Sequence, residues 1–322
     1  MKNNLKKKAI VTGCAGFIGS HMVEHLLKLN YHVIGIDNLS TGKLKFLEKP
    51  LKDRNFKFHK IDILKTKNLE KYFKSINLVI HLSANADVRN GFDNPKKDLE
   101  QNTLVTFKIL NVMRKLDIKK IVFSSTGSIY GEPDIFPTKE NQHFPIQTSL
   151  YGCSKLACEG LIQAFANGYN IKAYIFRFVS IFGERYTHGH LYDFYKKIKK
   201  NPKKLHILGN GLQKKSYLNV NDCVEAIFIA LKKSKKKVNI FNLGLEDFIT
   251  VNQSVNIVCN FLNVKPLRIY SGGKRGWIGD SPKIYLDTKK IRNLGWKPKK
   301  NIRQSIHETL TFFKKNEWIF KK

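Results

Sequence analysis

Short apolar runs alternate with stretches of helical spacing through the first half of the chain. The runs predict strands at Ala9–Val11, His32–Asp37, Phe56–Ile61, Leu78–Leu82 and Ile121–Ser125. The stretches between them predict helices over residues 17–29, 69–73, 95–116 and 149–165, with a further short helix after residue 43. This order of elements is typical of a parallel sheet with helices on both faces.

Three regularly spaced glycines separate the first strand from the first helix. Gly13 permits a tight turn, Gly16 lets the backbone approach a pyrophosphate, and Gly19 allows close packing of helix on strand. The N–H groups and partial positive charge of the helix N-terminus then attract phosphate. An isolated glycine triplet also fits an ordinary turn, but the flanking strand and helix favour dinucleotide binding.

Acidic and small residues follow the later strands, where a cofactor would lie. Asp37 ends the second strand about 20 residues after the glycines, the position of an acid that binds the adenosine ribose. Its charge would repel a 2′-phosphate, which predicts NAD rather than NADP. Asp62 is placed to accept a hydrogen bond from the adenine amino group, and the small residues Ser83 and Ala84 leave room for the cofactor.

A tyrosine and a lysine begin the helix that follows the fifth strand. Tyr151 and Lys155 are four residues apart and therefore share one helix face. An ammonium group near a tyrosine hydroxyl lowers the tyrosine pKa, which predicts that Tyr151 is a general base. A coincidental pair on a solvated face is the alternative. The preceding dinucleotide motif and the hydroxyls of residues 124–126 favour the catalytic interpretation.

With these motifs the chain resembles the extended short-chain dehydrogenases of the NAD-dependent epimerase/dehydratase family, and it is similar to the UDP-glucose 4-epimerases among them. The resemblance runs almost from end to end and rests on the glycine turn, on Tyr151 with Lys155, and on the segment from Arg177 to Gly183. It implies an α/β fold: a Rossmann-type doubly wound parallel sheet in residues 1–178 and a smaller C-terminal substrate-binding lobe. That lobe is mainly residues 179–322, with some segments returning to the first domain. The resemblance also implies NAD as cofactor, a nucleotide-sugar substrate and a homodimer.

The resemblance assigns roles to individual residues. The catalytic residues it implies are Thr126, Tyr151 and Lys155. The cofactor-binding residues it implies are Gly13, Gly16, Phe17, Ile18, Gly19, Asp37, Asn38, Asp62, Ile63, Leu82, Ser83, Ala84, Asn102, Ser124, Tyr151, Lys155 and Phe178. The substrate-binding residues it implies are Thr126, Ser180, Lys215, Arg275 and Asp280.

Some positions depart from the family pattern. Gly127 and Ser128 stand where the sugar 4,6-dehydratases of the family have Asp-Glu. Elimination of water needs such an acid and base, so the sequence argues against dehydration. Ser180 replaces an Asn common in 4-epimerases, Lys215 replaces a phosphate-binding Arg, and Ala86 replaces a Lys that contacts NAD. The chemistry is therefore better defined than the substrate.

Three functions remain open from the sequence. The first is a UDP-sugar 4-epimerase that oxidises C4 to a 4-keto intermediate and reduces it again. The second is a related nucleotide-sugar reductase or decarboxylase, which would use the same catalytic residues. The third is a non-catalytic dinucleotide-binding regulator. A regulator has no need of Thr126, Tyr151 and Lys155 together, so we favour an enzyme.

The chain carries 58 Lys and Arg against 25 Asp and Glu, a formal net charge of +33. Such a surplus attracts polyanions and anionic membranes. The basic residues are nevertheless spread along the chain and lack the interleaved aromatic residues of a single-strand binder. We therefore interpret them as a lysine-rich surface and predict no nucleic-acid partner. Residues 185–188 match no role in the family pattern.

The expected setting is the cytoplasm. No apolar run approaches the length of a membrane span and no secretory signal is recognisable, so we predict no membrane insertion. Five cysteines without Cys-x-x-Cys spacing argue against a disulfide framework and a zinc site. We expect no metal, and we expect all five cysteines to be small, partly buried side chains.

Overall fold

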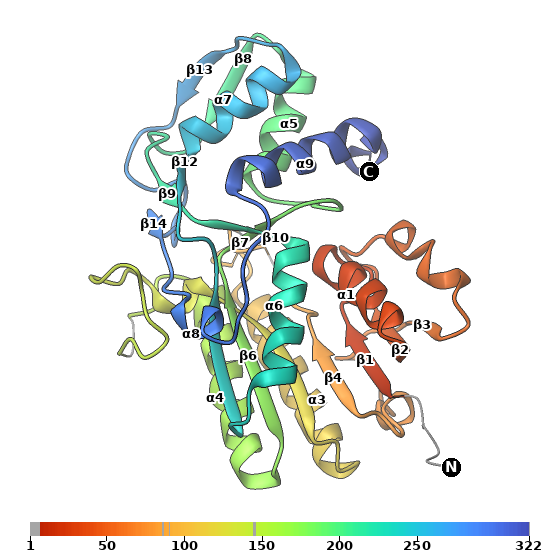
Figure 1. The fold of residues 1–322 in the computed structure, drawn as a ribbon. Coiled ribbons are helices and arrows are strands. Elements are labelled where there is room, and N and C mark those ends of the chain that lie inside the picture. Colours follow the sequence, from red (N-terminus) through yellow and green to blue (C-terminus); the bar gives the residue numbers. More distant parts are fainter. Residues whose placement is uncertain (1–6, 86, 90, 144–145, 322) are drawn as a thin grey trace.

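A seven-stranded parallel sheet forms the centre of the molecule (Figure 1). The computed structural model describes residues 7–85, 87–89, 91–143 and 146–321. The strand order is β11-β6-β5-β4-β1-β2-β3. The strands are β1 Lys8–Thr12, β2 His32–Asp37, β3 Phe56–Lys60, β4 Leu78–His81, β5 Lys120–Thr126, β6 Lys172–Phe178 and β11 Val238–Leu243. The five predicted strands correspond to β1 to β5, with small differences at their ends.

Helices cover both faces of this sheet. One face packs against α1 (Phe17–Lys28) and α6 (Val220–Lys233), and the other packs against α3 (Val105–Lys115) and α4 (Leu150–Tyr169). The two faces bury separate apolar clusters, one containing Met22 and Ile227 and the other containing Ile109 and Ile162. The strand order runs outward in both directions from β1 and β4, so the predicted Rossmann-type doubly wound fold is confirmed.

Smaller sheets and helices follow β6. Only Val179 separates β6 from β7, so the chain reaches these smaller sheets from the carboxyl edge of the large sheet. The strands outside the large sheet are β7 Ser180–Phe182, β8 Lys204–Ile207, β9 Lys214–Lys215, β10 Tyr217–Asn219, β12 Ile249–Thr250, β13 Leu267–Tyr270 and β14 Lys283–Ile284. The later helices are α5 His190–Lys200, α7 Val251–Leu262, α9 Ile302–Lys315 and the 3₁₀ helix η6 Glu317–Phe320, whereas α8 Lys289–Arg292 contacts β11 of the large sheet. Among the described residues, no helix is both long and apolar enough to cross a membrane.

Some elements differ from the predictions. The helix predicted over residues 95–116 is α2 (Pro95–Asp98), a π-helical turn η4 (Leu99–Leu104) and then α3. The helix predicted over residues 69–73 is only a 3₁₀ turn, η3 (Glu70–Tyr72), and the region after residue 43 forms the 3₁₀ turns η1 (Leu44–Leu47) and η2 (Pro50–Lys52).

Cys153 is exposed on α4, whereas the other four cysteines are buried, so the expectation of partial burial was wrong for Cys153.

Candidate active site

The glycine turn leaves its backbone open to a ligand. Gly13 has φ +71°, and a Cβ there would lie 2.8 Å from the backbone N of Ser83. A Cβ at Gly19 would lie 2.0 Å from the carbonyl oxygen of Gly13, so a side chain is excluded at both positions. The first helical bond of α1 joins the N–H of Ser20 to the carbonyl of Gly16, and no side chain caps this helix. The N–H groups of the first turn therefore have no partner among the described residues and are free to bind an anion.

Two carboxylates lie beside this turn at the ends of β2 and β3. Asp37 accepts hydrogen bonds from the N–H groups of Ala15 at 3.0 Å and Leu39 at 2.8 Å, one at each oxygen. Burial raises the pKa of Asp37. Each of its oxygens retains a lone pair for a ligand hydroxyl. The side-chain amide of Asn38 donates to Asp62 at 3.4 Å, so the acids predicted to flank adenosine lie side by side.

The three predicted catalytic residues come together at the carboxyl end of β5. The side chain of Thr126 lies close enough to the Tyr151 hydroxyl to lower the pKa of Tyr151. Thr126 ends β5, and its Oγ1 accepts from the N–H of Ser128 at 3.1 Å. Lys155, one turn beyond Tyr151 in α4, is buried and donates from Nζ to the carbonyl oxygen of Ser124 at 2.8 Å. Helix α4 starts there because Ser149 caps it, accepting from the N–H of Gly152 at 3.0 Å.

Burial has the largest effect on the ionisation of this pair. It raises the pKa of Tyr151 above its ordinary value, with a further contribution from the negative charge of Asp98. Burial lowers the pKa of Lys155 to about 8. The ammonium group of Lys155 donates to the Ser124 carbonyl and is not among the groups that shift the pKa of Tyr151, so the lowering of the tyrosine pKa by Lys155 stays a prediction.

Asp98 is a residue of the site that sequence reasoning missed. Its Oδ1 accepts from the side-chain amides of Asn85 at 2.8 Å and Asn102 at 3.3 Å. Its Oδ2 is buried and has no partner in the part of the chain that the structure describes. The side chain of Asn102 also donates to Ser154 on α4 at 2.8 Å, which joins this cluster to the catalytic helix. The sequence pattern that could have indicated Asp98 is its four-residue spacing from Asn102, which places the two residues on one helix face.

A buried ion pair braces the catalytic helix against the sheet. Glu159, one turn beyond Lys155, accepts from Arg177 of β6 at 2.8 Å and from the hydroxyl of Ser125 at 2.5 Å. Arg177 also donates to the hydroxyl of Tyr130 at 2.6 Å. The ion pair therefore ties α4 to β5 and β6. Glu159 too was absent from the predicted site. The sequence pattern that could have indicated it is its spacing, because Tyr151, Lys155 and Glu159 follow one another at intervals of four residues.

Three of the predicted substrate-binding residues lie together. Lys215 of β9 pairs with Asp280 at 2.5 Å, and Arg275 donates to the backbone carbonyl of Asp280 at 3.2 Å. The loop that carries Arg275 and Asp280 reaches the start of α4: a Cβ on Gly279 would lie 2.8 Å from the carbonyl of Thr148, which precedes Tyr151 by three positions. Ser180 is exposed on β7.

The remaining predicted cofactor residues lie along the same edge. Ile63 and Phe178 are buried, whereas Leu82, Ser83 and Ala84 are half-buried after β4. Ala86 lies outside the described residues.

The fold and the grouping of Thr126, Tyr151 and Lys155 define a protein of the extended short-chain dehydrogenase type. The chain belongs to the NAD dependent epimerase/dehydratase family, whose model matches residues 9–244.

Named relatives are similar over nearly the whole chain. A Methanocaldococcus jannaschii protein that carries a provisional UDP-glucose 4-epimerase name is 36% identical over 95% of this chain and 98% of its own length. The UDP-glucuronate 4-epimerase of Thermodesulfobacterium geofontis is 30% identical over 97% of this chain and 98% of its own. The solved UDP-glucose 4-epimerase of Thermotoga maritima, with UDP-glucose, is 31% identical over 96% of this chain and 99% of its own, with a TM-score of 0.86.

Proposed function

We propose that the protein is an NAD-dependent nucleotide-sugar 4-epimerase with a UDP-sugar as its substrate. The observation that carries the proposal is the grouping of Thr126, Tyr151 and Lys155 at the carboxyl end of β5. The epimerase names of similar proteins support the same conclusion. We further propose that residues 1–178 hold the cofactor and the catalytic residues, and that residues 179–322 mainly bind the substrate.

The residues around the glycine turn fit NAD. The free N–H groups at the start of α1 suit its pyrophosphate, and the remaining lone pairs of Asp37 suit the ribose hydroxyls of its adenosine. Asn38 and Asp62 suit the adenine side. NAD, when bound, can accept a hydride from the substrate and return it.

Asp37 should make the protein prefer NAD over NADP by at least about tenfold, or 1.4 kcal/mol. The reason is that its carboxylate would face the 2′-phosphate of NADP. Calorimetric titration with both cofactors measures the preference. Asp37→Asn should reduce it, whereas Asp117→Asn, at an exposed carboxylate after α3, should not. Comparable affinity of the unaltered chain for the two cofactors would contradict the role of Asp37.

Tyr151 acts as the general base and acid. Its phenolate takes the proton of the sugar 4-hydroxyl as C4 is oxidised, and Thr126 orients the same oxygen by a hydrogen bond. Lys155 supplies the nearby positive charge that favours the phenolate, against the burial that raises the tyrosine pKa. After the 4-keto sugar turns its other face toward the cofactor, the same proton returns to the oxygen, so no second acid is needed.

The residues after Thr126 argue against dehydration. Gly127 and Ser128 carry no carboxyl group, and a Cβ on Gly127 would touch Ile284 and Leu286 at 3.4 Å. These are ordinary van der Waals distances, so the argument rests on the missing carboxyl groups, which elimination of water would require.

The substrate diphosphate should lie on Lys215 and Arg275. Replacing either by alanine should raise KM at least about tenfold, because a charged hydrogen bond contributes about 1.5–3 kcal/mol. The kcat should change far less, because the contact is the same in the ground state and the transition state. Lys214→Ala is the matched control, since Lys214 precedes Lys215 in β9 but is exposed. Unchanged KM in both variants would place the diphosphate elsewhere.

The reaction itself is tested with substrate deuterated at C4. A 4-epimerase should return the label to C4 of the product, because the hydride leaves and re-enters the same bound cofactor. The product is analysed by mass spectrometry and proton NMR with a panel of UDP-sugars. Net reduction of free NAD would identify the second candidate function, a related reductase or decarboxylase, and would contradict the epimerase.

We also propose a homodimer. Large apolar side chains are exposed along η4, α3 and α4, namely Leu104, Phe107 and Tyr169. Pairing the two helices of one copy with those of another would bury them. Sedimentation equilibrium of the purified chain tests the proposal, and a monomer mass would contradict it. The five cysteines, all thiols, support our proposal of a reducing, cytoplasmic setting.

A further inference from the structure

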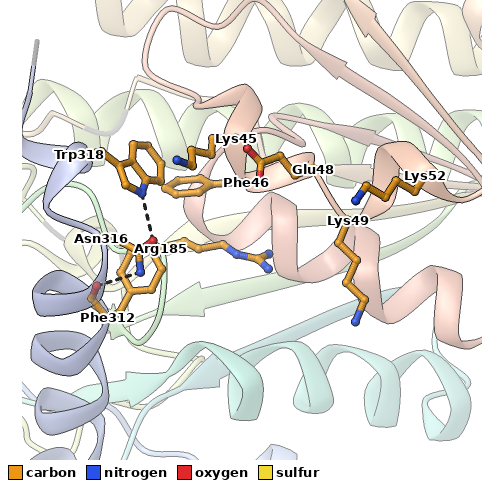
Figure 2. A pocket seen from close by; sticks show the side chains of 9 residues that line it. All are labelled: Lys45, Phe46, Glu48, Lys49, Lys52, Arg185, Phe312, Asn316 and Trp318. Carbon is orange, nitrogen blue, oxygen red and sulfur yellow. Dashed lines mark hydrogen bonds between the residues drawn. The ribbon is translucent and has the colours of Figure 1, made fainter.

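A cavity of about 340 Å³ lies between the segment after β2 and the C-terminal residues, and none of the predicted catalytic residues lines it. Its walls come from η1 and η2 on one side and from the C-terminal end of α9 with η6 on the other (Figure 2). Arg185, from the loop after β7, completes the lining. None of the residues proposed above to bind cofactor or substrate contributes to it.

The lining is strongly basic. Lys45, Lys49, Lys52 and Arg185 carry positive charge, and Glu48 carries the single negative charge among the lining residues. In Figure 2 the Arg185 side chain extends from the aromatic side of the cavity toward the lysines. Four cations around one cavity suit a ligand with several negative charges rather than a single one.

Arg185 is also incompletely paired. Its Nη2 pairs with Glu24 of α1 at 2.5 Å. Its Nη1 is buried and has no hydrogen-bond partner among the described residues. A buried donor without an acceptor is destabilising, and more so when it is charged. The backbone at Arg185 has φ +68°, which is unfavourable for a residue with a side chain. The chain thus tolerates strain to hold a guanidinium group at this cavity.

An indole ring lies at the other end of the cavity. The Nε1 of Trp318 already donates to the side-chain oxygen of Asn316 at 3.0 Å. The ring therefore offers apolar surface rather than a donor. Lys45 lies 4.7 Å from the ring centre and is exposed, so it can move to a ligand.

We propose that this cavity binds a small polyphosphate ligand, with phosphate oxygens on Arg185, Lys49 and Lys52. Inorganic polyphosphate and a nucleoside triphosphate share this chemistry. A nucleoside triphosphate would add contact between its base and Trp318. Tyr186, the residue after Arg185, packs edge to face on Phe17, the first residue of α1, with ring centres 5.6 Å apart. This contact would link the proposed site to the glycine turn before α1.

Calorimetry tests the proposal with tripolyphosphate and with ATP. The protein is first saturated with NAD and UDP, so that the proposed cofactor and substrate sites are filled, and the buffer contains physiological salt. The unaltered chain should bind one equivalent. Arg185→Gln and the double variant Lys49→Gln/Lys52→Gln should each weaken binding at least about tenfold, since each removes charged contacts of 1.5–3 kcal/mol. If ATP binds more tightly than tripolyphosphate and Trp318→Ala abolishes the difference, the ligand is a nucleoside triphosphate. If the two affinities are equal, the ligand is inorganic polyphosphate.

Because the chain has a high net positive charge, the experiment needs a control for general attraction of anions to its surface. Lys265→Gln removes one exposed charge far along the chain, and it should leave binding within about twofold of the unaltered protein, since surface charges act weakly at physiological salt. Equal weakening in Lys265→Gln and in the lysine double variant would show general surface attraction and overturn the proposal. So would unchanged binding in the double variant, whose exposed lysines can be replaced without disturbing the core.

Discussion

Replacing Tyr151 by phenylalanine should reduce kcat at least about 100-fold, because the variant cannot exchange the proton of the sugar 4-hydroxyl. The phenylalanine ring keeps the packing of the tyrosine ring at the start of α4, and only the hydroxyl group beside Thr126 is lost. Steady-state assays with the UDP-sugar that the unaltered enzyme converts best measure the effect. Calorimetry with NAD shows whether the cofactor still binds.

The matched control is Tyr72→Phe in η3, another partly buried tyrosine, far from the catalytic strand end. Its kcat should stay within about twofold of the unaltered enzyme, since it removes no reacting group. If Tyr151→Phe retained more than a tenth of the original kcat, Tyr151 would not be the general base and the mechanism would need another proton acceptor.

Replacing Glu159 by glutamine should lower the free energy of unfolding by about 3–5 kcal/mol. Glutamine has the same shape, so the loss measures charge rather than packing. The guanidinium of Arg177 would be left buried without its carboxylate, and the short bond from Ser125 would lose its charged acceptor. Urea denaturation followed by circular dichroism measures the change.

Two further variants separate the buried charge from other effects. Glu100→Gln removes a half-buried carboxylate that pairs with the exposed Lys96, and it should change the unfolding free energy by less than about 0.5 kcal/mol. The double variant Glu159→Leu/Arg177→Met leaves no unpaired charge and should be more stable than Glu159→Gln alone. A loss below 1 kcal/mol in Glu159→Gln would show that Arg177 finds sufficient partners in Tyr130 and the Glu140 carbonyl.

The parts of the fold that the sequence predicted are those that local patterns determine. Strands β1, β2, β4 and β5 contain short apolar runs that are mostly buried, as in a covered parallel sheet. Strand β3, at the edge of the sheet, instead alternates apolar and polar residues, a pattern that also predicts a strand. The glycine turn was predictable because neither Gly13 nor Gly19 has room for a side chain. The meeting of Thr126 and Tyr151 followed from topology, since one ends β5 and the other begins the helix after it.

The parts that were missed depend on contacts between distant segments. The π-helical turn at residues 99–104 shares its apolar spacing with an α-helix, so periodicity does not distinguish them. Asp98 and Glu159 are charged residues that patterns place on a surface, and their burial depends on partners that tertiary structure brings to them. The direction of the Lys155 ammonium toward Ser124 likewise depends on how closely α4 packs on β5.

The position of β11 in the large sheet has a consequence for biosynthesis. Strand β6 has seven residues, most of them buried, and its outer neighbour β11 lies after β7 to β10 in the chain. A ribosome must therefore synthesise the segment from β7 to β10 before β6 gains its last partner. Until then β6 is an unprotected apolar edge that can pair with other nascent chains. A fragment that ends at Phe178 would keep that edge permanently, so we expect residues 1–178 not to fold apart from the rest of the chain.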